Sequence, residues 1–108
     1  MRCKDCTCDI YYHDRNPDLD KPGYEVAIEG KKIVIRYQTA DGSFIFSGMD
    51  LGHGHFELEC HETNGWAMLH RQSPGSLVLE GSWYENGAHG MWRIYLNPRS
   101  SHEGANED

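Results

Sequence analysis

Three cysteines stand close together near the start of the chain, at Cys3, Cys6 and Cys8. A C-x-x-C-x-C spacing lets two or three thiolates converge on one soft metal ion, and zinc is the default ion for such ligands. The run therefore predicts a structural zinc at the N-terminus, with free or redox-active thiols and a disulfide as the alternatives. A tetrahedral site needs one more ligand, and the candidates are His13, Cys60 and His61.

A second group of metal-binding side chains lies mid-chain, where His53, His55 and Glu59 all occupy odd-numbered positions. Alternate residues of a regular strand project from one face, so these side chains would meet there. Imidazole nitrogens and a carboxylate can hold a divalent ion, and His89 could complete the set. The alternative is an amphipathic strand whose polar face lies in water.

The same residues carry a family resemblance. His53-x-His55 followed by Glu59 resembles the H-x-H-x(3,4)-E metal motif of the cupins. Residues 77–81, with the sequence LVLEG, look like the strand and turn that cupins carry after that motif. The resemblance implies a small β-barrel with a divalent metal held inside it, and a barrel of that kind could have enzymatic activity.

Two Gly-x-Trp sequences, ending at Trp83 and Trp92, flank an Asn-Gly turn. Glycine two residues before a large aromatic leaves room for a neighbouring ring where a sheet curls tightly. Such hairpins are similar to those of calycin-type barrels such as lipocalins and avidins, which implies a cavity for a small ligand. Trp66, Trp83, Trp92 and Tyr37 are predicted to line that cavity, with plain core packing as the alternative.

Strands must position these side chains, because turn signals recur about 10 to 12 residues apart, which is hairpin spacing. Apolar residues alternate between the turns, as in strands with one buried face. Phe56 and Leu58 share such a face, and Trp66 and Met68 are assigned to the buried face of the following strand. Connections this short require antiparallel neighbours. We therefore expect an all-β fold, an antiparallel meander of about seven strands forming a small closed or half-open barrel. The turn signals are Glu29-Gly30, Asp41-Gly42, Gly52-His53-Gly54, Asn64-Gly65, Pro74-Gly75 and Asn86-Gly87.

The length of 108 residues suits one domain. We expect a Cys-rich arm over residues 1–23 packed on the domain, a barrel over 24–96 and a disordered acidic tail over 97–108. The net charge of −7 and the scattered basic residues argue against nucleic acid or an anionic membrane as partner. The chain has neither a long apolar run nor a signal-like N-terminus, which predicts a cytoplasmic protein.

Together these observations favour a non-enzymatic binding module for a small molecule or a protein partner, with zinc at the N-terminal cysteines. A cupin-like metal barrel is the second hypothesis. The third is an acidic interaction or inhibitor protein that docks on a basic partner.

Overall fold

Each predicted turn separates two strands, and the fold is an all-β closed barrel in which every strand pairs antiparallel with its neighbours. The computed structural model describes residues 1–97. None of these residues forms a helix that is long and apolar enough to cross a membrane. The strands are β1 (Arg2–Tyr12), β2 (Asp18–Glu29), β3 (Lys32–Thr39), β4 (Gly42–Asp50), β5 (His55–Cys60), β6 (Gly65–His70), β7 (Val78–Glu85) and β8 (Ala88–Tyr95).

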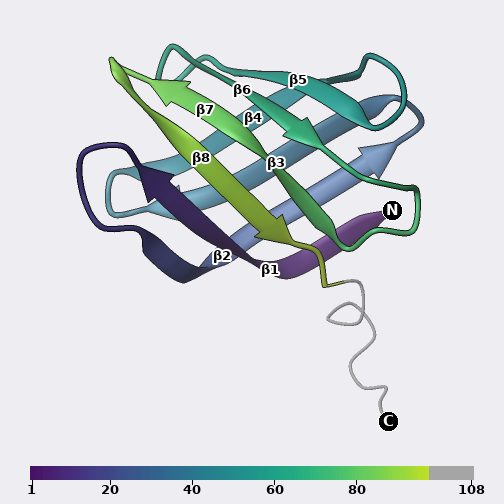
Figure 1. Cartoon of the computed structure of the whole chain (residues 1–108), viewed down its shortest axis with the longest axis horizontal. Coiled ribbons are helices and arrows are strands. Elements are labelled where there is room, and N and C mark those ends of the chain that lie inside the picture. Colours follow the sequence, from purple (N-terminus) through teal and green to yellow (C-terminus); the bar gives the residue numbers. More distant parts are fainter. Residues whose placement is uncertain (98–108) are drawn as a thin grey trace, which may run out of the picture.

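The strands follow one another around the barrel in chain order, and β1 closes the ring by pairing with β8 (Figure 1). Six consecutive residue pairs join these two strands, from Thr7 with Tyr95 to Tyr12 with Gly90. The predicted meander and its closure are therefore confirmed. The barrel has eight strands, close to the expected number of about seven, and the additional strand comes from the N-terminal segment.

Where the sequence predicts an arm over residues 1–23, the structure has β1 and the first half of β2 in the barrel wall. Strand β1 is bulged: its register with β2 shifts between Cys3 and Cys6, and Asp5 between them has a φ of 57°. The extra residue turns both Cys3 and Cys6 inward, although side chains three apart in a regular strand face opposite ways. The predicted tail lies, from residue 98 onward, outside the described residues.

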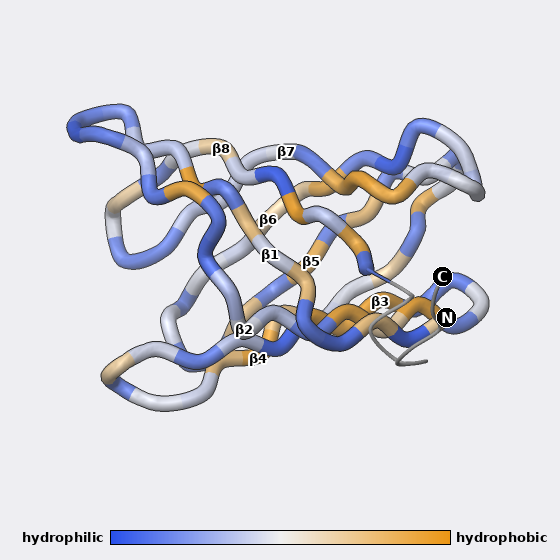
Figure 2. The backbone as a smooth tube through the Cα atoms, turned by 90° about the horizontal axis from the view of Figure 1, so that it is seen from below, coloured by the Kyte–Doolittle hydropathy of each residue, from blue (hydrophilic) through white to orange (hydrophobic). Residues whose placement is uncertain are grey.

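The two ends of the barrel differ in what fills them. At the end that holds the N-terminus, which we call the base, the inward side chains are mainly aliphatic, and Ile33, Leu69, Leu79 and Ile94 have no exposed surface. The base turns are also tied together, since the Arg71 N–H donates to the Gly54 carbonyl at 2.8 Å. Hydrophobic segments lie mainly within the strands, whereas most turns are hydrophilic (Figure 2). The base is therefore a packed core.

The β7–β8 hairpin is built as the Gly-x-Trp spacing predicts. Gly81 pairs with Trp92 across the two strands, and Gly90 pairs with Trp83, so each glycine lies opposite the ring of the other strand. A Cβ on Gly90 would come within 2.9 Å of the Trp83 ring and would overlap the Tyr11 carbonyl of β1. The glycines thus make room both for the rings and for the close approach of neighbouring strands.

The prediction of which side chains of β6 face the barrel interior is wrong. Trp66 and Met68 project from the outside of the barrel, with Trp66 47% exposed, whereas Ala67 and Leu69 are buried inside. Residues 65–69 are uncharged on both faces of the strand, so hydrophobicity alone does not distinguish the inner from the outer face. The large indole of Trp66 instead stacks on Tyr84 of β7, with ring centroids 6.1 Å apart.

Asp9 of β1 joins three strands. Its Oδ1 accepts the backbone N–H of Asp20 in β2 at 2.9 Å, and its Oδ2 accepts the hydroxyl of Tyr95 in β8 at 2.8 Å. The side chain is only 8% exposed. It therefore braces the seam where the irregular β1 meets its two neighbours.

The variant Asp9→Ala is expected to lower the free energy of unfolding by about 2 to 4 kcal/mol, because two donors lose a charged acceptor. Tyr95→Phe removes only one of these bonds and should cost about 1 kcal/mol. Urea denaturation followed by circular dichroism measures both changes. Equal losses in the two variants would contradict the bracing role of Asp9.

Candidate functional site

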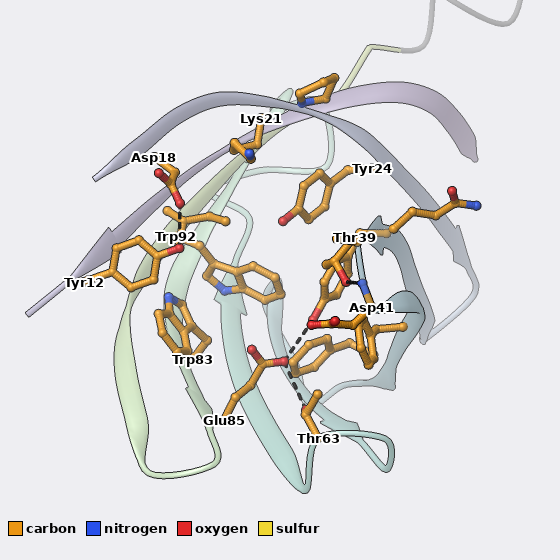
Figure 3. A pocket seen from close by; sticks show the side chains of 17 residues that line it. Tyr12, Asp18, Lys21, Tyr24, Thr39, Asp41, Thr63, Trp83, Glu85 and Trp92 are labelled. Atoms are coloured by element: carbon orange, nitrogen blue, oxygen red, sulfur yellow. Dashed lines mark hydrogen bonds between the residues drawn. The ribbon is translucent and has the colours of Figure 1, made fainter. Parts of the chain in front are cut away.

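The opposite end of the barrel, which we call the mouth, holds a cavity of about 410 Å³. Four connections meet there, between β1 and β2, β3 and β4, β5 and β6, and β7 and β8 (at the left in Figure 1). The side chains around the cavity come from β1, β2, β3, β4, β7 and β8 and from the connections at this end, including the β5–β6 turn (Figure 3). In contrast with the aliphatic base, most of the large ones are aromatic.

Aromatic rings line the cavity in two groups of rings that contact one another. The rings of Tyr24 and Tyr37 stack with centroids 5.2 Å apart and planes inclined by 12°. Phe46 contacts Trp92 at 5.4 Å, and Tyr12 meets Trp83 edge to face at 5.7 Å. Such contacts hold the rings in place, so the cavity is lined by aromatic surfaces of fixed orientation.

A carboxylate is fixed among these rings. Oε2 of Glu85 accepts the Tyr37 hydroxyl at 2.9 Å and the Thr63 hydroxyl at 3.1 Å (Figure 3). Within residues 1–97 no donor bonds the other oxygen, Oε1. Burial, and next the negative charge of Glu85, raise the pKa of Tyr37 far above its ordinary value. The phenol therefore remains a hydrogen-bond donor to Glu85 at any physiological pH.

The indole of Trp92 presents an unsatisfied donor on the cavity wall. Trp92 is 4% exposed, and its Nε1 is buried without a hydrogen-bond partner in the described part of the chain. Its nitrogen-bearing edge is turned toward Trp83 and the Glu85 carboxylate in Figure 3. Trp83 differs, because its Nε1 donates to the Met91 carbonyl at 3.1 Å. Buried N–H groups nearly always have partners, so Trp92 marks an exceptional position.

The charges around the cavity are mainly negative. Asp18, Asp41 and Glu85 are among the lining residues, against Lys21 as the basic one. Asp18 is held by the Tyr12 hydroxyl at 2.8 Å (Figure 3). The mouth therefore favours positively charged molecules over negatively charged ones.

The N-terminal cysteines lie in strand β1, with their side chains inside the barrel. Cys3, Cys6 and Cys8 have no exposed surface, and Cys60 is 1% exposed. Burial raises the pKa of Cys6 to about 11 and that of Cys8 to about 12. His13, proposed as their fourth ligand, lies exposed and stacks on His89, with ring centroids 4.3 Å apart. The structure thus brings the three thiols to the interior and places the histidine elsewhere.

The second predicted metal set projects outward. Phe56, Leu58 and Cys60 fill the inner face of β5, so His55 and Glu59 lie on the outer face. His55 contacts His70 of β6 with ring centroids 5.0 Å apart, whereas His53 lies in the β4–β5 turn. Among residues 1–97 no three His, Cys, Asp or Glu side chains converge as a metal site would require.

Of the four aromatics predicted to line a cavity, the structure brings together Trp83, Trp92 and Tyr37. Trp66 lies on the outer surface. Sequence reasoning missed Glu85. This residue lies two positions after Trp83, so it is on the same face of the strand, and it directly precedes the Asn86-Gly87 turn at the mouth. Tyr12, which follows Ile10 on the inner face of β1, could have been found by the same parity.

In comparisons with known proteins, no family model matches the chain, and no curated protein matches it in sequence. By its architecture the protein is a closed antiparallel eight-stranded barrel with an aromatic cavity at one end.

Proposed function

We propose that this barrel is a binding protein that takes up a small organic molecule in the cavity at its mouth. The observation that carries the proposal is the Trp92 indole N–H, which is buried on the cavity wall without an acceptor in residues 1–97. A buried donor left unpaired costs about 1 to 3 kcal/mol, because it has given up its hydrogen bond to water. A ligand that carries an acceptor would remove this penalty.

The form of the cavity supports the proposal. A volume of about 410 Å³ falls within the range of about 300 to 1,000 Å³ that is typical of small-molecule pockets. An eight-stranded barrel can hold one small ligand where side chains do not fill its interior. The aromatic walls offer a large apolar contact area, while Glu85 and Trp92 supply a few fixed polar groups. This combination is common in sites that bind drug-sized molecules.

The three tryptophans allow the proposal to be tested within one molecule. N-phenyl-1-naphthylamine, a neutral apolar amine, is titrated into ¹⁵N-labelled protein while the three indole N–H signals are followed by NMR. Because Trp92 and Trp83 line the cavity, their signals are expected to shift. The signal of Trp66, exposed on the outer face, is expected to stay. Single Trp→Phe variants assign the signals.

The same spectra also reveal binding at the wrong place. Trp66 and Trp83 both border an apolar hollow on the outside of the barrel, together with Met91 and Tyr84. A probe that binds there would shift Trp66 and Trp83 while leaving Trp92 unchanged. That pattern would show that the probe binds outside the barrel and would contradict its binding in the cavity. An absence of shifts both with this neutral probe and with protonated aromatic amines would refute the proposed function.

A further inference from the structure

The cavity combines rings and carboxylates in a way that selects one class of ligand. Its wall is made of the electron-rich faces of tyrosine, phenylalanine and tryptophan, and a positive charge is attracted to such faces. One ring at the mouth already holds a cation: the guanidinium carbon of Arg15 lies 4.0 Å from the centroid of the Tyr12 ring. Tyr12 lines the same cavity. Arg15 occupies one face of Tyr12, and the other rings that line the cavity offer faces of the same kind to a cation.

Glu85 adds a fixed negative charge at the wall. Two hydroxyl groups hold its Oε2, which orients the carboxylate without neutralising it. Oε1 carries no bond from a donor in residues 1–97 and can accept one from a ligand. A neutral apolar ligand would cover this charge and leave it without a partner, which is unfavourable. A ligand with an ammonium group would satisfy it with a charge-assisted hydrogen bond.

Trp92 adds the opposite requirement, since its buried N–H needs an acceptor. An anionic acceptor such as a carboxylate or phosphate would face Asp18, Asp41 and Glu85, with Lys21 the basic residue among the lining groups. A neutral oxygen, such as a hydroxyl or carbonyl, satisfies the N–H without that repulsion. The ligand thus needs one cationic group and one neutral acceptor.

Building on the proposed function, we infer that the natural ligand is an organic cation, a small amine with an aromatic or apolar body and a neutral oxygen acceptor. The ammonium group binds Glu85 Oε1 and the faces of the surrounding rings, and the oxygen accepts the hydrogen bond of Trp92. A hydroxylated arylalkylamine has this chemistry and fits a cavity of about 410 Å³.

Three probes of nearly equal shape test the inference by calorimetry. Tyramine has both groups, tyrosol replaces the ammonium with a neutral hydroxyl, and phenethylamine lacks the phenol oxygen. Tyramine is expected to bind about tenfold or more tightly than tyrosol, because the charge-assisted bond to Glu85 is lost with the neutral probe. Phenethylamine is expected to bind less tightly than tyramine, because Trp92 then remains unpaired.

Variants connect each preference to its residue. Glu85→Gln keeps an acceptor for Tyr37 and Thr63 but removes the charge, and it should abolish the preference for tyramine over tyrosol. Glu80→Gln removes the same charge from the outer face of the same strand, where Glu80 pairs with Arg93 at 3.5 Å, and it should leave the preference intact. Trp92→Phe should abolish the preference for tyramine over phenethylamine.

The outcomes separate this inference from the proposed function. If N-phenyl-1-naphthylamine shifts the Trp92 signal but tyramine binds no better than tyrosol, the cavity binds ligands and the cation inference is wrong. The cation inference also fails if Glu85→Gln and Glu80→Gln change the preference equally. If neither the neutral dye nor any of the three probes binds in the cavity, both proposals fail.

Discussion

Replacing Gly81 with alanine is expected to lower the free energy of unfolding by about 3 kcal/mol or more, because the added methyl group has no space. A Cβ at Gly81 would overlap the backbone carbonyl of Met68 and reach within 3.0 Å of the Leu69 Cα in the neighbouring strand. Backbone atoms of a paired strand cannot move aside as a flexible side chain can. The two strands would have to separate locally, which weakens the ladder between β6 and β7.

The chain supplies a matched control for this substitution. Gly75, in the β6–β7 turn, has no atom within 4 Å of an added Cβ and does not have a positive φ. Gly75→Ala should change stability by about 0.5 kcal/mol or less, or raise it slightly by restricting the unfolded chain. Urea denaturation of both variants, followed by far-ultraviolet circular dichroism, measures the difference. Similar midpoints for the two variants would show that β6 and β7 are not in the tight contact described.

The second large effect is a loss of stability at alkaline pH. Burial raises the pKa of Cys6 from 9.0 to about 11 and that of Cys8 from 9.0 to about 12. Below pH 9 both thiols are protonated whether the chain is folded or not, so this contribution to stability is fully present. As the pH rises from 9 toward 11, the unfolded chain releases these protons while the folded barrel retains them. Each thiol then favours unfolding by about 1.4 kcal/mol per pH unit.

Denaturant midpoints at pH 7, 9 and 10 would measure this loss. The double variant Cys6→Ala, Cys8→Ala should lose stability less steeply above pH 9 than the unchanged protein, whatever its stability at pH 7. The phenols of Tyr24 and Tyr37, whose pKa values burial also raises, should add to the loss only above pH 10. A slope that the double variant leaves unchanged would mean that the two thiols ionise as readily in the folded barrel as in the unfolded chain.

The strands that alternation predicted correctly are those with one polar and one apolar face. In β5, Phe56 and Leu58 face inward while Glu57 and Glu59 face outward, so a single register is possible. Turn chemistry was equally informative, since Asn86 and Gly87 both adopt the positive φ that a type I′ hairpin turn requires. At these positions the conformation that the residue types favour locally is the one that the barrel requires.

Sequence reasoning failed where the rule of alternation does not apply. The bulges of β1 break the two-residue repeat, so the spacing of its cysteines did not indicate that they lie in a strand of the barrel wall. In β6 both faces are largely uncharged, and parity could not separate Trp66 from Ala67. The site was half predicted: the rings of Trp83, Trp92 and Tyr37 were expected, but Thr63 comes from a turn. Its contact with Glu85, 22 residues away along the chain, follows from the pairing of β6 with β7, which brings the β5–β6 turn beside the end of β7.

Closure of the sheet restricts how the mouth can adapt to different molecules. Every strand has hydrogen-bonded neighbours on both sides, so the barrel has no edge strand that could separate to widen the cavity. The circumference of the barrel is therefore fixed by its strands. Only the connections around the rim are free to vary in length and residue type. Grafting new sequences into the β3–β4 turn should therefore change the rim of the cavity while the melting temperature of the barrel stays close to that of the unchanged protein. The rim and the barrel wall can thus be altered separately, the rim by changing the connections and the wall only by changing the strands.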